Sequence, residues 1–144
     1  MGVFTMKQIF YSFFFLIILI SIANAQSKFS EEDIKNTLEK IFDLSKNQDY
    51  KALATHFTYK EGEEFKVYNY NDKAEAKIVK RLSKKIKAYL DLSDSYTISN
   101  ISITKKEKLG NITLDILFNS GNQKLKITFV FVDNAGVLLL ADFK

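Results

Sequence analysis

The chain has 144 residues, a formal net charge of +4 and 47% hydrophobic residues, values typical of a single globular domain. It contains no cysteine, which excludes disulfides and thiolate metal sites. The charge excess is too small for a typical nucleic-acid-binding protein and no motif of that class is present, so no nucleic-acid partner is expected.

The first residues have the pattern of a secretory signal peptide. Lys7 precedes an apolar run from Ile9 to Ala23, and Ala23-Asn24-Ala25 has the small-residue form of a cleavage site. The run has about 15 residues, whereas a membrane-spanning helix needs roughly 20; an uncleaved anchor is the alternative. We therefore predict cleavage after Ala25 and an exported protein, periplasmic or secreted, whose single domain is residues 26–144. No cysteine stands at the junction, so a lipoprotein is not expected.

Helix signals dominate the first half of this domain. Ser30, followed by three acidic residues, is predicted to cap a first helix that ends near Asn47. A short second helix is expected from Asp49. Asp72, with Glu75 three residues later, predicts a capping box for a third helix. This helix has an apolar face made by Ile78, Val79, Leu82, Ile86, Tyr89 and Leu90.

The opposite face of the third helix is basic. Its cations are Lys73, Lys77, Lys80, Arg81, Lys84, Lys85 and Lys87. A charged face of this kind is usually solvated. A second interpretation is weak attraction to anionic lipid or to polyanionic envelope sugars, because basic amphipathic helices bind such surfaces.

Strand patterns dominate the second half. A short edge strand is predicted at residues 65–70, after Gly62, which interrupts regular secondary structure. Another strand is predicted from Tyr96 to Ile103. The apolar phase of the latter shifts at Ser99-Asn100, which predicts a β-bulge. From Asn111 to Phe143, alternating apolar residues predict a meander of three antiparallel strands.

The turns of the meander predict which residues face the core. A turn at Ser120-Gly121 would pair Ile116 with Leu125, and a loop at residues 133–136 would pair Phe129 with Ala141. This register places Val137, Leu139, Ala141 and Phe143 on the core face. It leaves an apolar patch on the outer face, for which a homodimer partner is the simplest explanation; the patch residues are Val130, Val132, Leu138 and Leu140.

The order of these elements resembles the nuclear-transport-factor-like (cystatin-like) superfamily, over essentially the whole exported part. The residues that carry the resemblance are the helix-to-helix step "NQDYKALATHF" and the closing strand pair "KITFVFVDNAGVLLLADF". The resemblance implies an α+β fold in which N-terminal helices pack on a strongly bent, cone-like antiparallel sheet with a C-terminal β-meander. It also implies a pocket inside the cone and frequent dimerisation through the sheet. No catalytic motif of the superfamily is present, and Leu138–Leu140 stand where a tryptophan is common.

A pocket inside such a cone would lie between the apolar sheet face and the helices. The candidate ligand-binding residues are His56, Phe57, Tyr70, Tyr89, Leu114, Ile127 and Phe129. The sheet side of this pocket offers no ionisable group, so no catalytic residue is predicted. The function that this pattern favours is a non-enzymatic binding module for a small apolar ligand or a protein partner.

Two alternatives stay open. One is an enzyme of the isomerase, dehydratase or hydrolase kind, with His56 or Asp142 in the pocket, although the predicted register turns Asp142 away from the core. The other is an envelope-surface adaptor that uses the basic helix at residues 73–90.

Asp115 is expected to pair with Lys126 across the strands. A single histidine and no cysteine predict no metal site, and no cofactor is expected.

Overall fold

The computed structural model describes residues 28–106 and 109–144. The predicted signal peptide and its cleavage site lie outside these residues. The described helices are α2 (Glu31–Lys46), α3 (Tyr50–Ala54) and α4 (Lys73–Asp91), and the strands are β1 (Thr58–Glu61), β2 (Glu64–Val67), β3 (Ser95–Lys106), β4 (Leu109–Ser120), β5 (Gln123–Asn134) and β6 (Val137–Phe143).

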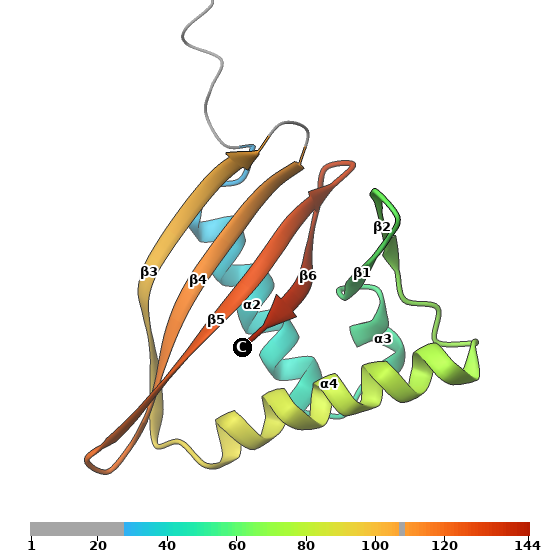
Figure 1. The fold of residues 1–144 in the computed structure, drawn as a ribbon. Coiled ribbons are helices and arrows are strands. Elements are labelled where there is room, and N and C mark those ends of the chain that lie inside the picture. Colours follow the sequence, from blue (N-terminus) through green and yellow to red (C-terminus); the bar gives the residue numbers. More distant parts are fainter. Residues whose placement is uncertain (1–27, 107–108) are drawn as a thin grey trace, which may run out of the picture.

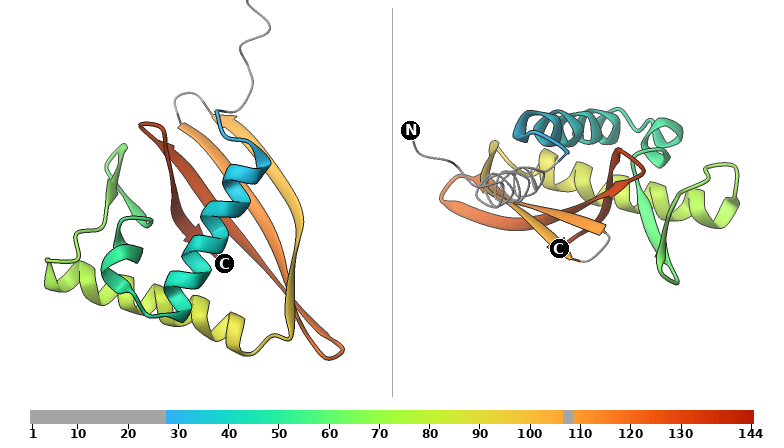
Figure 2. Two further views of the ribbon diagram at one scale, coloured as in Figure 1. Left: turned by 180° about the vertical axis from the view of Figure 1, so that it is seen from behind. Right: turned by 90° about the horizontal axis from the view of Figure 1, so that it is seen from above.

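The fold is a curved antiparallel sheet with helices on one face, as predicted. The sheet has the strand order β3-β4-β5-β6, and β1 and β2 form a separate hairpin. In Figure 1, α2 crosses behind the sheet and α4 runs beneath it, and Figure 2 shows both helices on the same side. The predicted bulge in β3 is confirmed, because the register with β4 shifts between Ile98 and Asn100.

The predicted helix boundaries are also confirmed, with one correction at α4. Asp72 caps α4 by accepting hydrogen bonds from the Ala74 and Glu75 amides, but Glu75 does not complete a capping box. The Asp72 N–H already donates to the Asn69 carbonyl, so the Glu75 carboxylate instead accepts from the Asn69 N–H and the Tyr59 hydroxyl. It thereby ties the loop before α4 to the helix.

The strand predicted at residues 65–70 is present as β2, but it ends at Val67 and belongs to a hairpin whose first strand, β1, was not predicted. The chain forms the β1–β2 hairpin, in which Glu61 pairs with Glu64. The predicted break at Gly62 is the turn of this hairpin, where Gly62 has φ +63°. Glycine at the first central position of a two-residue turn allows this conformation without steric cost.

The predicted register of β4 with β5 is wrong by two residues. Ile116 lies opposite Ile127 and not Leu125, because the turn is Gly121-Asn122, with Gly121 at φ +54°. A shift of two residues preserves the face of every side chain. The inner face therefore still carries the predicted apolar residues of both strands.

The predicted register of β5 with β6 is wrong, and the error changes which β6 side chains face the core. The turn is Ala135-Gly136, both at positive φ, and it pairs Phe131 with Leu140. The register then shifts beside Ala141, so that Phe129 pairs with Phe143. Leu138 and Leu140 consequently belong to the core, whereas Val137 is 54% exposed.

Residues from all three helices join the inner sheet face in one core. Ser45 on α2 and Ser83 on α4 are also buried, and the two helices contact each other. The other helix residues of the core are Ile34, Leu38, Ile41, Phe42, Leu53, Ala54, Val79, Ile86 and Leu90.

No helix of the described segments has the length and apolar character that crossing a membrane requires.

Candidate functional site

The predicted pocket between sheet and helices is filled by its own side chains. Phe57 and Phe129 are 1% and 0% exposed, and Leu114 and Ile127 are also buried in the core. The Phe129 ring stacks on Phe143, with centroids 5.3 Å apart. These four candidate residues are therefore part of the hydrophobic core between the sheet and the helices.

The two tyrosines predicted for the pocket lie at its edges. Tyr89 is half-buried, contacts the Phe118 ring at 5.5 Å, and lines a groove of about 480 Å³ together with Leu92 and Leu125. Tyr70 is also half-buried, with the Lys80 ammonium 5.8 Å from its ring centre. Both fit the amphipathic use of tyrosine, with the ring packed and the hydroxyl end near water.

His56 lies between α3 and β1 and is half-buried. Its carbonyl accepts a hydrogen bond from the Leu140 N–H at 2.9 Å, which joins this loop to β6. Within residues 28–106 and 109–144, no hydrogen bond reaches the imidazole. Burial lowers the pKa of His56, and the positive charge of Lys40 lowers it further.

This lowered pKa predicts a pH-dependent stability. Between pH 6.5 and the lower pKa of the folded state, His56 is mostly neutral in the folded chain and mostly protonated in the unfolded chain. The free energy of unfolding should therefore fall as the pH drops from about 6.5 through the lower folded pKa. Urea unfolding at several pH values measures this slope. It should flatten in His56→Gln, and an unchanged slope in that variant would contradict the assignment.

Asp142 and Asp115 both face away from the core, as predicted. Asp142 is exposed, and its carboxylate accepts a hydrogen bond from the Phe143 N–H at 2.8 Å. The predicted contact of Asp115 with Lys126 is confirmed at 3.3 Å, although Thr128 stands directly opposite and donates at 2.6 Å. The Thr128 hydroxyl holds the pKa of Asp115 below its ordinary value.

The outer apolar patch predicted for a homodimer is not an exposed surface of the chain. Val132, Leu138 and Leu140 are 1%, 5% and 2% exposed, and Val130 is half-buried. The phase of β6 places Leu138 and Leu140 in the core. Val132 lies opposite Leu139, which is also buried. Homodimerisation stays a prediction, but this patch does not support it.

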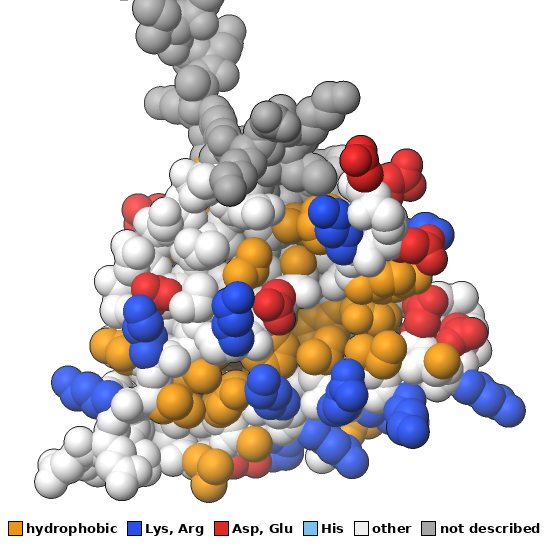
Figure 3. All heavy atoms as spheres, in the orientation of Figure 1, with side chains coloured by type: hydrophobic (Ala, Val, Ile, Leu, Met, Phe, Trp, Pro, Cys, Tyr) orange, Lys and Arg blue, Asp and Glu red, His pale blue; other side chains and the backbone are white. Residues whose placement is uncertain are grey.

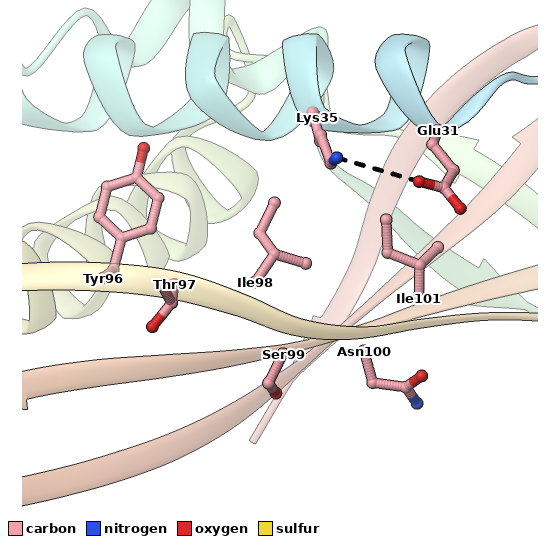
Figure 4. A pocket seen from close by; sticks show the side chains of 8 residues that line it. All are labelled: Glu31, Lys35, Tyr96, Thr97, Ile98, Ser99, Asn100 and Ile101. Carbon is pink, nitrogen blue, oxygen red and sulfur yellow. Dashed lines mark ion pairs between the residues drawn. The ribbon is translucent and has the colours of Figure 1, made fainter.

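An open groove of about 610 Å³ lies between α2 and β3. Figure 4 shows Tyr96, Ile98 and Ile101 pointing from β3 toward α2, with Ser99 and Asn100 both on the other side of the strand. The bulge produces this arrangement, because two consecutive residues on one side allow both isoleucines to face the helix. Glu31 and Lys35 of α2, 3.9 Å apart, form the opposite wall. The bulge was predictable from the sequence, but the groove was not.

A larger groove of about 720 Å³ lies along α4. Ala74 and Ile78 supply its apolar floor, and its other lining residues are all cations: Lys77, Lys80, Arg81 and Lys84. Figure 3 shows basic side chains along α4, below a broad hydrophobic area on the same side of the molecule. The spacing of the cations was predicted, whereas the groove required the structure.

The cations of α4 differ in what they contact. Lys87 pairs with Asp91 at 2.6 Å, and the Lys85 ammonium lies 5.0 Å from the centre of the Phe143 ring. Lys80 lies over the rings of Tyr50 and Tyr70. In the described part of the chain, none of the four groove cations forms an ion pair with a carboxylate. Their charge is therefore available to an external anion.

The described residues form neither a catalytic pair of His56 with Asp142 nor a cluster of metal ligands. Neither His56 nor Asp142 lines the grooves described above, and no hydrogen bond joins the two residues in the described segments. Over these same segments, no group of three His, Asp or Glu side chains is placed to hold a metal ion.

Comparison with known proteins shows a similarity of fold. No protein-family model matches the sequence, and no curated protein matches it. A de novo designed NTF2 fold protein, NT-9, is similar in structure, with a TM-score of 0.52, 14% sequence identity, and coverage of 81% of this chain and 87% of that chain.

Two natural proteins show a weaker likeness. An NTF2-like protein with a cystatin-like fold from Novosphingobium aromaticivorans has a TM-score of 0.39 and 10% identity, covering 99% of this chain and 89% of its own. An NTF2-like protein of unknown function from Shewanella oneidensis MR-1 has a TM-score of 0.41 and 10% identity, covering 78% and 94%. The likeness to NT-9 shows that the chain has the NTF2-like α+β fold.

Proposed function

We propose that the protein is an exported, non-enzymatic binding protein that attaches to anionic lipid surfaces through α4. The observation that carries the proposal is the α4 groove, whose lining combines two apolar residues with four cations and contains no carboxylate. Apolar contact together with positive charge is the combination by which an amphipathic helix binds the lipid interface. The groove thus fits an anionic headgroup above an apolar body.

The position of α4 in the fold favours attachment at the surface over insertion. Val79, Ile86 and Leu90 are buried in the core, so the strongly apolar side of the helix is already occupied. A basic residue near an anionic membrane contributes about 1 kcal/mol, so the four groove cations contribute about 4 kcal/mol. Binding of this strength is reversible, and it weakens as salt screens the charges.

The filled cone interior also supports an outer surface as the binding site. A small apolar ligand between sheet and helices would have to displace side chains such as Phe57 and Phe129, which are 1% and 0% exposed. The α4 groove is open without any such displacement. The ligand expected from the sequence is therefore better matched by an amphiphile at α4 than by a molecule inside the cone.

Sedimentation with lipid vesicles tests this function. The protein is expected to bind vesicles that contain phosphatidylglycerol, to bind pure phosphatidylcholine vesicles weakly, and to lose binding at high salt. Lys77→Glu combined with Lys84→Glu should weaken binding at least about 30-fold, because two attractive charges are lost and two repulsive ones are added. Both side chains are exposed, so the fold should be unaffected.

The matched control is Lys40→Glu combined with Lys124→Glu. It makes the same change in net charge at exposed positions on α2 and β5. This variant should keep most of the binding. Equal binding to both kinds of vesicle, or equal losses in the two double variants, would contradict a site on α4.

A further inference from the structure

The two edges of the four-stranded sheet differ in what covers them. At the β6 edge, the Leu140 N–H donates to the His56 carbonyl at 2.9 Å, and Phe57 forms a parallel bridge with Leu140. At the other edge, β3 pairs with β4 on one side only, and over the described residues nothing pairs with its outer side. Half of the backbone N–H and C=O groups of an edge strand point outward, which makes β3 a template for another strand.

β3 also lacks most of the usual protections of an exposed edge. Natural proteins keep such edges short or place proline and inward-facing charges on them. β3 has 12 residues, the whole chain contains no proline, and no charged residue precedes Lys105 in the strand. Its bulge is one such protection; there the Ser99 hydroxyl donates to the Asp115 carbonyl of β4 at 3.0 Å.

The groove between α2 and β3 begins at this open edge. Ile98 and Ile101 are half-buried and face α2 across the groove (Figure 4). Alternate side chains of a strand added beside β3 would enter the same layer, because side chains of neighbouring strands share a face of the sheet. The two isoleucines would then pack against apolar side chains of the added strand.

The helical wall of the groove gives the added strand a charge preference. Glu31 is 72% exposed and has one cation beside it, Lys35. Glu39 and Asp43 lie farther along α2, close enough to Tyr96 that they add to the effect of burial in raising the pKa of its hydroxyl. At helical spacing, Lys35 and Lys46 share this side of α2 with Glu31, Glu39 and Asp43. Lys35 pairs with Glu31, and the remaining excess of carboxylates favours a basic partner.

We propose that the β3 edge binds an extended, basic peptide segment of a partner protein by strand addition. Alternate apolar side chains of the segment occupy the α2–β3 groove, and its lysines or arginines face Glu39 and Asp43. Backbone hydrogen bonds supply the affinity and the groove supplies the sequence preference, as in other cases of strand addition. A second copy of this chain fits less well, because its own β3 has no lysine or arginine between Ser95 and Thr104 that could pair with Glu39 and Asp43.

The probe for this proposal is a synthetic nine-residue peptide that alternates valine with lysine, carrying a fluorescent label. Binding is followed by anisotropy, and hydrogen exchange of the protein amides locates the site. The peptide should bind with a dissociation constant below about 1 mM and should slow exchange on β3 but not on β6. The same peptide with glutamate in place of lysine should bind at least about tenfold more weakly.

Two charge variants separate the groove from a general effect of net charge. Glu39→Lys combined with Asp43→Lys should weaken peptide binding at least about tenfold, because it reverses the charge of the α2 wall. Glu63→Lys combined with Glu64→Lys makes the same change on the β1–β2 hairpin and should leave binding unchanged. All four side chains are exposed, so both variants should fold.

Several outcomes would overturn the proposal. These are the absence of peptide binding, protection of β6 in place of β3, and equal losses in the two charge variants. Protection of β3 by self-association in the peptide-free protein would assign the edge to a second copy of the chain and would also overturn it. None of these results bears on vesicle binding through α4, so the two proposals fail independently.

Discussion

Replacing Leu140 by aspartate is expected to destabilise the protein strongly. Leu140 is 2% exposed, lies opposite Phe131 in the sheet, and bridges to Phe57. A carboxylate at this place has no cationic partner in the core, and burying an unpaired charge is among the most destabilising of substitutions. We expect a loss of at least about 4 kcal/mol, a large share of the total stability of a domain of this size.

Two control variants make this result specific. Leu140→Met conserves the apolar volume and should cost less than about 1.5 kcal/mol. Val137→Asp introduces the same charge into the same strand, but at a position 54% exposed, and should change stability by about 0.5 kcal/mol or less. Urea unfolding followed by circular dichroism measures the free energy of unfolding of the three variants. A Leu140→Asp protein as stable as Val137→Asp would contradict the phase of β6 in the structure and would again favour an outer-face patch.

Truncation of Phe129 to alanine is expected to destabilise the protein by about 3–5 kcal/mol. Phe129 is fully buried, stacks on Phe143 at 5.3 Å, and makes an edge contact with Phe42 at 5.7 Å. Its ring therefore joins β5 and β6 to α2. The loss combines the transfer free energy of the ring with the cost of a cavity that the surrounding strands and helix cannot close.

The same variant tests whether the cone interior is a core or a ligand pocket. Leu125→Ala, on the same strand but 48% exposed, is the control and should cost much less. If Phe129→Ala unfolds at the same urea concentration as the unchanged protein, the ring contributes little to stability. The interior would then be open to the small apolar ligand that the sequence suggests.

The correct predictions came from local signals. Ser30, Asp49 and Asp72 begin helices because their side-chain oxygens accept hydrogen bonds from amides of the first helical turn, which depends only on nearby residues. The bulge near Ser99 was visible as a shift in apolar period. The basic face of α4 likewise follows from spacing alone.

The error that changed which side chains face the core came from β6, where local signals are ambiguous. Residues 137–141 are all apolar, so alternation does not distinguish the two faces of the strand. The turn also requires positive φ at Ala135, which alanine rarely adopts, so its chemistry did not indicate a two-residue turn. The shift beside Ala141 then returns Phe143 to the core face, which is why the prediction was right at Phe143 and wrong at Leu138 and Leu140.

The sequence by itself determined the class of fold, the helices with their caps, the meander, and the cations of α4, because each depends on residues close together in the chain. Only the tertiary structure decided that the cone interior is filled, that Leu138 and Leu140 lie inside it, and that β3 is the open edge beside a groove. These properties depend on which distant segments meet. The cause is physical: burial and strand pairing are set by contacts between α2, the sheet and α4, and such contacts leave no periodic signal in the sequence.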